Sequence, residues 1–253
     1  MAPEAENLST VNRDELPVQV YSDNSIEVAA LLTLSGGFLD VFTYIGHGHV
    51  FANSMTGNVV FLGMYAATGN WHQALRHIPP IVAFLAGVLI AYRMHLPSVL
   101  KYLPKPALTC LGLEIIVLIV ASFLSDSFPD VLLVLVIALV AAMQNSNFTK
   151  LELWTYNSVM TTGNLRRFAE AFFRGTMPGL DRVAMREARL FGFVCLCFLS
   201  GAVLAALATP RLHDYSLFIP AGILFIAFII CWRRQKAKFL YVKFKYKSSR
   251  TDQ

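Results

Sequence analysis

Long apolar runs separated by short polar segments limit most strongly what this chain can fold into. A helix that crosses a bilayer needs about 20 mainly apolar residues. About six runs have that length and character: 26–45, 78–95, 106–124, 129–147, 187–208 and 214–232. Prolines stand near the starts of four of these runs, where a helix tolerates them. The runs predict an integral membrane protein rather than a soluble domain.

Composition and the distribution of charge lead to the same prediction. Hydrophobic residues make up 56% of the chain and charged residues only 15%, whereas soluble domains carry about 25% charge. Much of this charge lies at the two ends of the chain. We therefore predict an acidic, disordered N-terminal tail (1–25), a transmembrane domain (26–232) and a basic cytoplasmic tail (233–253). Because the first 25 residues are polar, no secretory signal peptide is expected.

Two further apolar stretches are too short to span. They cover about 57–68 and 163–173, and a helix of roughly a dozen residues is only about 18 Å long. The hydrocarbon core is about 30 Å thick. The sequence Gly46-His47-Gly48-His49 also interrupts the helix before the first stretch. We predict that both are re-entrant half-helices.

Polar motifs recur in the same order in the two halves of the chain. Asp40 precedes Asn-Ser-Met-Thr-Gly-Asn at 53–58, and Asn145 stands at nearly the same distance before a related motif at 157–164. This second motif carries an extra threonine. Farther on, Phe-Leu-Ala-Gly at 84–87 matches Phe-Leu-Ser-Gly at 198–201. Each half (26–124 and 129–232) therefore reads as helix, half-helix, helix, helix.

Three spans per half is an odd number, so the second half must enter the membrane from the opposite side. The predicted fold is an all-α integral membrane protein of about six transmembrane helices and two re-entrant half-helices in an inverted repeat, as in many secondary transporters. Basic residues favour the cytoplasmic side. The loop with Lys101 and Lys105, the segment 166–189 and the C-terminal tail are basic. Both termini are thus predicted to be cytoplasmic, while the identity of the membrane stays open.

The two polar motifs are the candidate site for a solute. A helix N-terminus leaves about four N–H groups unpaired, and Ser, Thr and Asn side chains can cap them. Two such positive ends meeting near the midplane would suit an anion or a small polar solute. Alternatively, the motifs only cap and pack the half-helices. The candidate substrate-binding residues are Asp40, Asn53, Ser54, Thr56, Gly57, Asn58, Gln144, Asn145, Asn157, Ser158, Thr162, Gly163 and Asn164.

Two acids lie within predicted spans, where a carboxylate is costly. Asp40 has no neighbouring cation in the sequence and is matched by the neutral Asn145. It could carry a coupling proton or cation, or it could form a buried hydrogen bond that fastens the first helix to a half-helix. Glu114 has no counterpart in the second half, and we expect it to be a partly hydrated structural residue.

The motif residues resemble a known family. Gly37-Phe38-Leu39-Asp40 with the motif at 51–58, and Gln144-Asn145 with Thr162-Gly163-Asn164-Leu165, resemble the paired signatures of YoaK-like membrane proteins. The similarity covers roughly 26–232. It implies a multi-pass membrane protein of uncharacterised function and indicates no substrate.

Other classes of chemistry find little support in the sequence. No catalytic constellation is recognisable, so we predict no enzyme activity and no cofactor. The four cysteines lie in apolar runs, where thiols behave as small hydrophobes, and no metal site is expected. The basic tail suits the bilayer surface and its anionic lipids, and no nucleic-acid partner is expected. Homo-oligomerisation is left open.

The leading functional prediction is a transporter of a small polar or anionic solute, proton-coupled through Asp40. A channel-like pore is one alternative, because paired re-entrant helices also build pores. A non-transporting membrane scaffold, or an accessory protein of a membrane-bound pathway, is the other.

Overall fold

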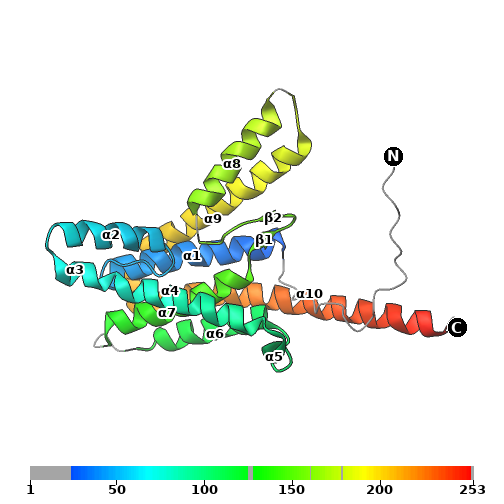
Figure 1. Cartoon of the computed structure of the whole chain (residues 1–253), viewed down its shortest axis with the longest axis horizontal. Coiled ribbons are helices and arrows are strands. Elements are labelled where there is room, and N and C mark those ends of the chain that lie inside the picture. The colour runs from blue at the N-terminus through cyan, green and yellow to red at the C-terminus, as the bar shows by residue number, and fades with distance from the viewer. Residues whose placement is uncertain (1–23, 125–127, 160, 178, 252–253) are drawn as a thin grey trace.

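The computed structural model describes residues 24–124, 128–159, 161–177 and 179–251, with side chains up to Lys236. The predicted acidic tail therefore lies almost entirely outside the described residues, and so do most side chains of the basic tail. Within them the chain forms a bundle of helices (Figure 1). Its elements are α1 (Ile26–Gly46), α2 (Met55–Ala67), α3 (Trp71–Arg76), α4 (Ile78–Met94), α5 (Pro97–Leu100), α6 (Pro106–Ala121), α7 (Asp130–Asn147), β1 (Lys150–Leu151), β2 (Trp154–Thr155), α8 (Thr161–Thr176), α9 (Arg182–Leu212), a 3-10 turn η1 (His213–Leu217) and α10 (Phe218–Thr251).

Local chemistry explains where several helices begin and end. The Ser25 side chain accepts a hydrogen bond from the Val28 amide and caps α1. Gly48 and His49 then take positive φ angles of 81° and 59°, which end the first helix in a turn. Asp181 caps α9 by accepting from two amides of its first turn. These caps satisfy backbone donors that a helix end leaves unpaired.

The helices pack in a regular order. α1 lies along α9, and α4 lies along α7. α6 packs between α7 and α10, and α10 also contacts α1. The chain reverses at η1, so that α9 and α10 meet at one end of the bundle (Figure 1).

The outer surface of the bundle is apolar. Within the described residues, four continuous helical stretches are long and apolar enough to cross a membrane: Ile26–Gly46, Trp71–Met94, Asp130–Asn147 and Arg182–Lys236. Large apolar side chains such as Leu85, Ile116 and Leu199 are more than half exposed. Soluble monomers rarely expose continuous apolar surface of this extent. The all-α membrane fold expected from the sequence is therefore confirmed at this level.

Several details of the structure differ from the sequence prediction. The chain between Gln144-Asn145 and the motif at 157–164 forms a short antiparallel hairpin, β1–β2, in which Glu152 takes a positive φ of 51°. A separate short helix, α3, lies between α2 and the span α4. α9 extends beyond the predicted 187–208 at both ends. Its added first turns are polar and are capped by Asp181, so no apolar run marks them in the sequence.

Candidate functional site

Asp40 joins α1 to the two residues that immediately precede α2. Its Oδ1 accepts hydrogen bonds from the amides of Asn53 (2.7 Å) and Ser54 (3.1 Å). Its Oδ2 accepts from the Ser54 hydroxyl. Ser54 is the N-cap residue of α2 but makes no capping bond of its own. The buried carboxylate of Asp40 thus binds the N-cap residue of a helix that begins 15 residues later in the chain.

The second half has a simpler form of the same contact. The Ser158 hydroxyl donates to Asn145 Oδ1 at 3.0 Å. Asn145 lies on α7, as Asp40 lies on α1, and both are buried. The correspondence read from the sequence is therefore matched by corresponding hydrogen bonds.

Each motif contains a buried asparagine whose side chain bonds to the backbone seven residues earlier. Asn58 accepts from the Phe51 amide (3.0 Å) and donates to the Phe51 carbonyl (2.8 Å). Asn164 pairs with the amide (3.4 Å) and carbonyl (2.6 Å) of Asn157 in the same way. Each side-chain amide pairs with backbone groups of an irregular segment that has no helical or strand partners. This pairing stabilises the segment, because buried unpaired backbone groups are costly. Asn58 also lies 3.1 Å from Nδ1 of His77.

The two motifs meet at Gly36, in the middle of α1. The Asn53 side chain donates to the Gly36 carbonyl at 3.5 Å. From the other half, a Cβ added to Gly36 would lie 2.9 Å from a methyl of Val159 and 3.4 Å from the Ser158 carbonyl. The starts of both half-helices thus lie beside one short segment of α1.

The candidate residues differ in what they offer to a solute. Asp40, Asn53, Asn58, Asn145, Ser158 and Asn164 are buried and hydrogen-bonded within the protein, and Gln144 is buried. Gly57 packs against the ring of Phe51. Ser54 and Asn157 are half-buried. Thr56, Thr162 and Gly163 are exposed, so the polar atoms free to contact a solute lie mainly on the two threonines.

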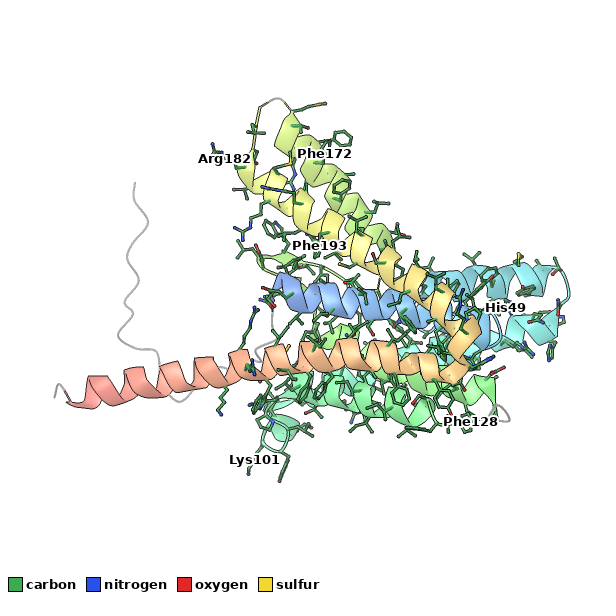
Figure 2. The ribbon with its side chains drawn as sticks, turned by 180° about the vertical axis from the view of Figure 1, so that it is seen from behind. His49, Lys101, Phe128, Phe172, Arg182 and Phe193 are labelled. Carbon is green, nitrogen blue, oxygen red and sulfur yellow. The ribbon has the colours of Figure 1, made fainter. Side chains whose placement is uncertain are left out.

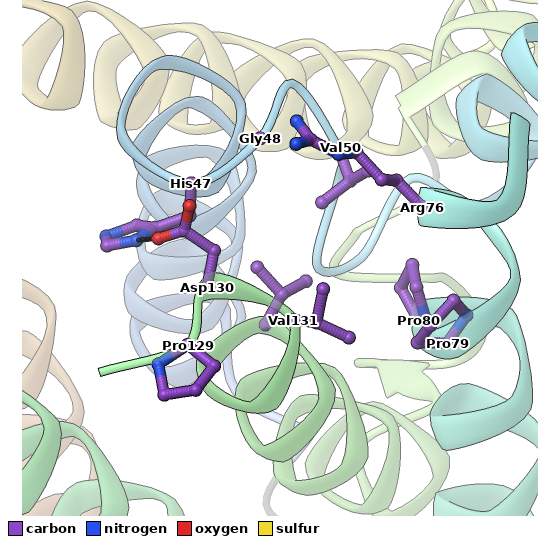
Figure 3. A pocket seen from close by; sticks show the side chains of 10 residues that line it. His47, Gly48, Val50, Arg76, Pro79, Pro80, Pro129, Asp130 and Val131 are labelled. Atoms are coloured by element: carbon purple, nitrogen blue, oxygen red, sulfur yellow. Dashed lines mark hydrogen bonds and ion pairs between the residues drawn. The ribbon is translucent and has the colours of Figure 1, made fainter. Parts of the chain in front are cut away.

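Two cavities lie at the far end of α1 and flank His47, and Figure 3 shows the one lined by Arg76 and Asp130. One, of about 170 Å³, is lined by Arg76, Pro79 and Pro80 across from Asp130. The other, of about 370 Å³, is lined by Thr209, His213 and Asp214. None of the candidate residues from the motifs lines either cavity.

His47 bridges three segments at this end. Its Nδ1 lies 2.8 Å from Asp130 Oδ1 at the start of α7, and its Nε2 lies 3.0 Å from Asp214 Oδ1 in η1. Only the protonated imidazole can donate from both nitrogens. This pairing was not predicted from the sequence. The signal that could have revealed it is that Asp130 and Asp214 stand at starts of predicted spans on the same side as His47.

The opposite end of the bundle has a corresponding contact. Glu152 follows His47 by 105 residues, the same separation as between Asp40 and Asn145. Its amide donates to the Asn24 carbonyl at 2.6 Å, and its carboxylate pairs with Arg186 at 2.9 Å. In each half, the segment after the first helix thus contacts the start of the other half's first helix.

The structure also bears on metal binding and on Glu114. Among the described residues, no group of three or more His, Cys, Asp or Glu side chains is arranged to hold a metal ion. Glu114 is buried to 2% exposure, and its Oε2 has no hydrogen-bond partner within the described part. The expectation that it is partly hydrated was wrong, because α6 packs this side chain between neighbouring helices.

Comparisons with known proteins identify the family. The family model described as "Protein of unknown function (DUF1275)" matches residues 28–230. The chain is 26% identical over 204 residues to the UPF0700 transmembrane protein YoaK of Bacillus subtilis (strain 168), an alignment covering 78% of this chain and 89% of that relative. No solved structure matches the chain. The resemblance inferred from the paired motifs is thereby confirmed: this chain is a multi-pass transmembrane protein and belongs to the DUF1275 family.

Proposed function

We propose that the protein is a six-span transporter of a small polar or anionic solute, built from two inverted halves. The six spans are α1, α4, α6, α7, α9 and α10. This count divides the long stretch Arg182–Lys236 at η1 and adds the shorter apolar helix α6.

Corresponding helix crossings support the two-half arrangement. A Cβ on Gly201 of α9 would overlap the Leu34 carbonyl oxygen of α1. A Cβ on Gly87 of α4 would overlap the Leu139 carbonyl oxygen of α7. Leu34 and Leu139 each stand six residues before the paired residues Asp40 and Asn145. α1 therefore crosses α9, and α7 crosses α4, at corresponding points of the two halves.

The observation that carries the transport proposal is the position of the two helix breaks. Both α2 and α8 follow irregular segments that contact Gly36, at the middle of the 21-residue α1. Non-helical backbone at membrane depth is tolerated only where it is buried in protein or lines a cavity. Transporters place solute sites at such discontinuous helices near the midplane.

In this proposal Asp40 couples proton binding to movement of α2. Its carboxylate accepts all three of its hydrogen bonds from Asn53 and Ser54. Adding a proton to this carboxylate would remove acceptor capacity and loosen the start of α2. Asn145 cannot act in this way, so coupling resides in the first half.

The two ends of the bundle act as closures. His47 with Asp130 and Asp214 closes one end, and Glu152 with Arg186 and Asn24 closes the other. Alternate opening of these contacts would expose the central motifs to one side at a time. By the positive-inside rule, the end that carries Lys101 and the C-terminal part of α10 is cytoplasmic. Basic residues of the tail would then face anionic lipid.

One observation favours a second candidate, a non-transporting scaffold or accessory protein. Asn58, Asn164 and Asp40 are fully engaged in bonds within the protein. Such bonds are sufficient to explain the motifs as caps.

A thermal-shift screen of detergent-purified protein against small anions, organic acids and neutral metabolites separates the two candidates. A ligand at a hundred times its dissociation constant stabilises the folded state by about 2.7 kcal/mol. The matched control is Thr56→Val/Thr162→Val, because these exposed threonines can be changed without breaking the buried bonds. A stabilising solute whose effect is lost in this variant, and which is taken up by proteoliposomes, supports transport. An empty screen with an unchanged variant favours the scaffold.

A further inference from the structure

The α8–α9 hairpin leaves the bundle sideways. Figures 1 and 2 show α8 and the first half of α9 leaning away from the other helices, with Phe172 and Arg182 on the distant part. The paired segment in the first half, α2 with α3, instead projects from the end of the bundle, with α2 nearly parallel to α1 (Figure 1).

One face of α8 is already used in packing. Its buried residues Asn164, Ala171 and Gly175 share a side of the helix with Phe168. A Cβ on Gly192 of α9 would lie 3.1 Å from the Phe168 ring, and one on Gly175 would lie 3.0 Å from the Met185 amide. α8 therefore runs antiparallel to the first turns of α9.

A second face of α8 is apolar and exposed. Leu165, Phe172 and Phe173 are 54%, 42% and 57% exposed. At 100° per residue they lie within one sector of the helix, next to the packed face. The exposed apolar surface continues over the connection into α9 through Met177, Leu180 and Val183.

The third face is charged. Arg166 pairs with Glu170 at 2.7 Å, and the hydrogen bond and charge of this arginine lower the pKa of Glu170. Arg174 reaches the buried Glu187 of α9 at 2.7 Å. Among the described residues, Arg182 and Arg189 have no ion pair. The segment 161–189 carries six arginines against three acids, so it is net positive.

Helix length places this hairpin at the membrane surface. α9 has 31 residues, about 46 Å at 1.5 Å per residue. The hydrocarbon core is only about 30 Å thick. A helix of this length that runs along the membrane normal extends about ten residues beyond the core, and the polar first turns of α9 are the part that suits the headgroups.

We propose that the outer part of this hairpin, 172–189, is a docking surface for the anionic leaflet of the bilayer, whereas the start of α8 stays at membrane depth beside Gly36 of α1. The apolar face of α8 enters the boundary of the acyl chains, and the arginines contact lipid phosphates. Amphipathic helices with cations on one face and Phe or Leu on the other bind the membrane interface through the same two kinds of contact. The proposal depends on the chain being a membrane protein and is independent of transport.

Site-specific photo-crosslinking tests where the faces lie. Benzoylphenylalanine is placed at position 172, or at 170 on the charged face, in full-length protein in vesicles of phosphatidylcholine with 30% phosphatidylglycerol. We expect lipid adducts from position 172 to exceed those from 170 at least fivefold. Protein adducts at 172, or equal lipid adducts at both positions, would overturn the proposal.

The charge requirement is tested with Arg182→Gln/Arg189→Gln. Each arginine near an anionic surface contributes about a fivefold preference. The ratio of phosphatidylglycerol to phosphatidylcholine adducts at position 172 should therefore fall at least fivefold in this variant. Arg211→Gln, at the other end of α9, should leave the ratio unchanged. An unaltered ratio in the double variant, with wild-type thermal stability, would refute the electrostatic part.

Discussion

Asp40 and Asn145 occupy equivalent places in the two halves but differ in charge and in the bonds they accept. Asp40 receives two backbone amides and a hydroxyl, whereas Asn145 receives the hydroxyl of Ser158. The single carboxylate is therefore the chemical difference between two otherwise similar capping sites.

Replacing Asp40 separates its structural role from its charge. Asp40→Ala leaves three donors unpaired, each costing about 1–3 kcal/mol, so we expect a loss of about 3 kcal/mol in the free energy of unfolding. Asp40→Asn retains an acceptor oxygen, and Ser54 can reorient its hydroxyl, so the expected loss is about 1 kcal/mol. Thermal unfolding in detergent measures both variants. Equal losses would mean that the charge itself is required for the cap.

Asn58 and Asn164 offer a paired comparison. Both side-chain amides bond to a backbone amide and carbonyl seven residues earlier, but Asn58 also contacts His77. Asn58→Ala should therefore destabilise the protein by about 1 kcal/mol more than Asn164→Ala. A larger effect at Asn164, measured in the same unfolding assay, would contradict the assignment of the extra bond.

The His47 bridge predicts unequal effects of its two carboxylates. The side chain of Asp130 is 55% exposed and that of Asp214 only 17%. Exposed ion pairs contribute about 0–1 kcal/mol, and hydrogen bonds to charged groups in less exposed places about 1.5–3 kcal/mol. Asp214→Asn should lower stability more than Asp130→Asn, and His47→Gln should lower it at least as much as Asp214→Asn. The reverse order would show that His47 is held mainly from α7.

At the scale of elements, close helix crossings depend on two glycines. Gly201 and Gly87 place a carbonyl of the partner helix where a Cβ would lie. Gly201→Ala or Gly87→Ala must push α1 from α9, or α4 from α7, at a cost of about 1–3 kcal/mol. Gly222 in α10 has open space around it, so Gly222→Ala should be neutral or stabilise by up to about 1 kcal/mol. A similar loss at all three glycines, in thermal unfolding, would argue against specific crossings.

The sequence predicted the elements better than the contacts between them. The bounds of α1, α4 and α7 were placed within a few residues, because an apolar run of spanning length is a strong local signal. The β1–β2 hairpin and helix α3 were missed, since neither has a periodic pattern. The pairing of His47 with Asp130 and Asp214 spans 83 and 167 residues, and no local pattern encodes such contacts.

The candidate site was predicted in part. Pairing of the two motifs follows from their repetition, and their residues do meet at Gly36. That most of these polar atoms form hydrogen bonds within the protein could not be predicted from the sequence. The partners of Asp40 and Asn58 are brought close by the fold and not by a local pattern. The cavities beside His47 were not foreseen for the same reason.

At the scale of the whole molecule, the central claim is that the two halves are inverted in the membrane. Asn70 lies at the tip of the α2–α3 connection, and Gly179 lies at the tip of the α8–α9 hairpin, and both are exposed. In an inverted repeat these equivalent tips face opposite sides of the bilayer.

The most direct test introduces Asn70→Cys or Gly179→Cys into a chain whose four native cysteines are alanine, in oriented vesicles. Labelling with a membrane-impermeant maleimide is then compared before and after the vesicles are opened. We predict that the two positions are labelled from opposite sides, with position 179 on the side of the C-terminus. Labelling of both from the same side would contradict the inverted arrangement and the transport mechanism built on it.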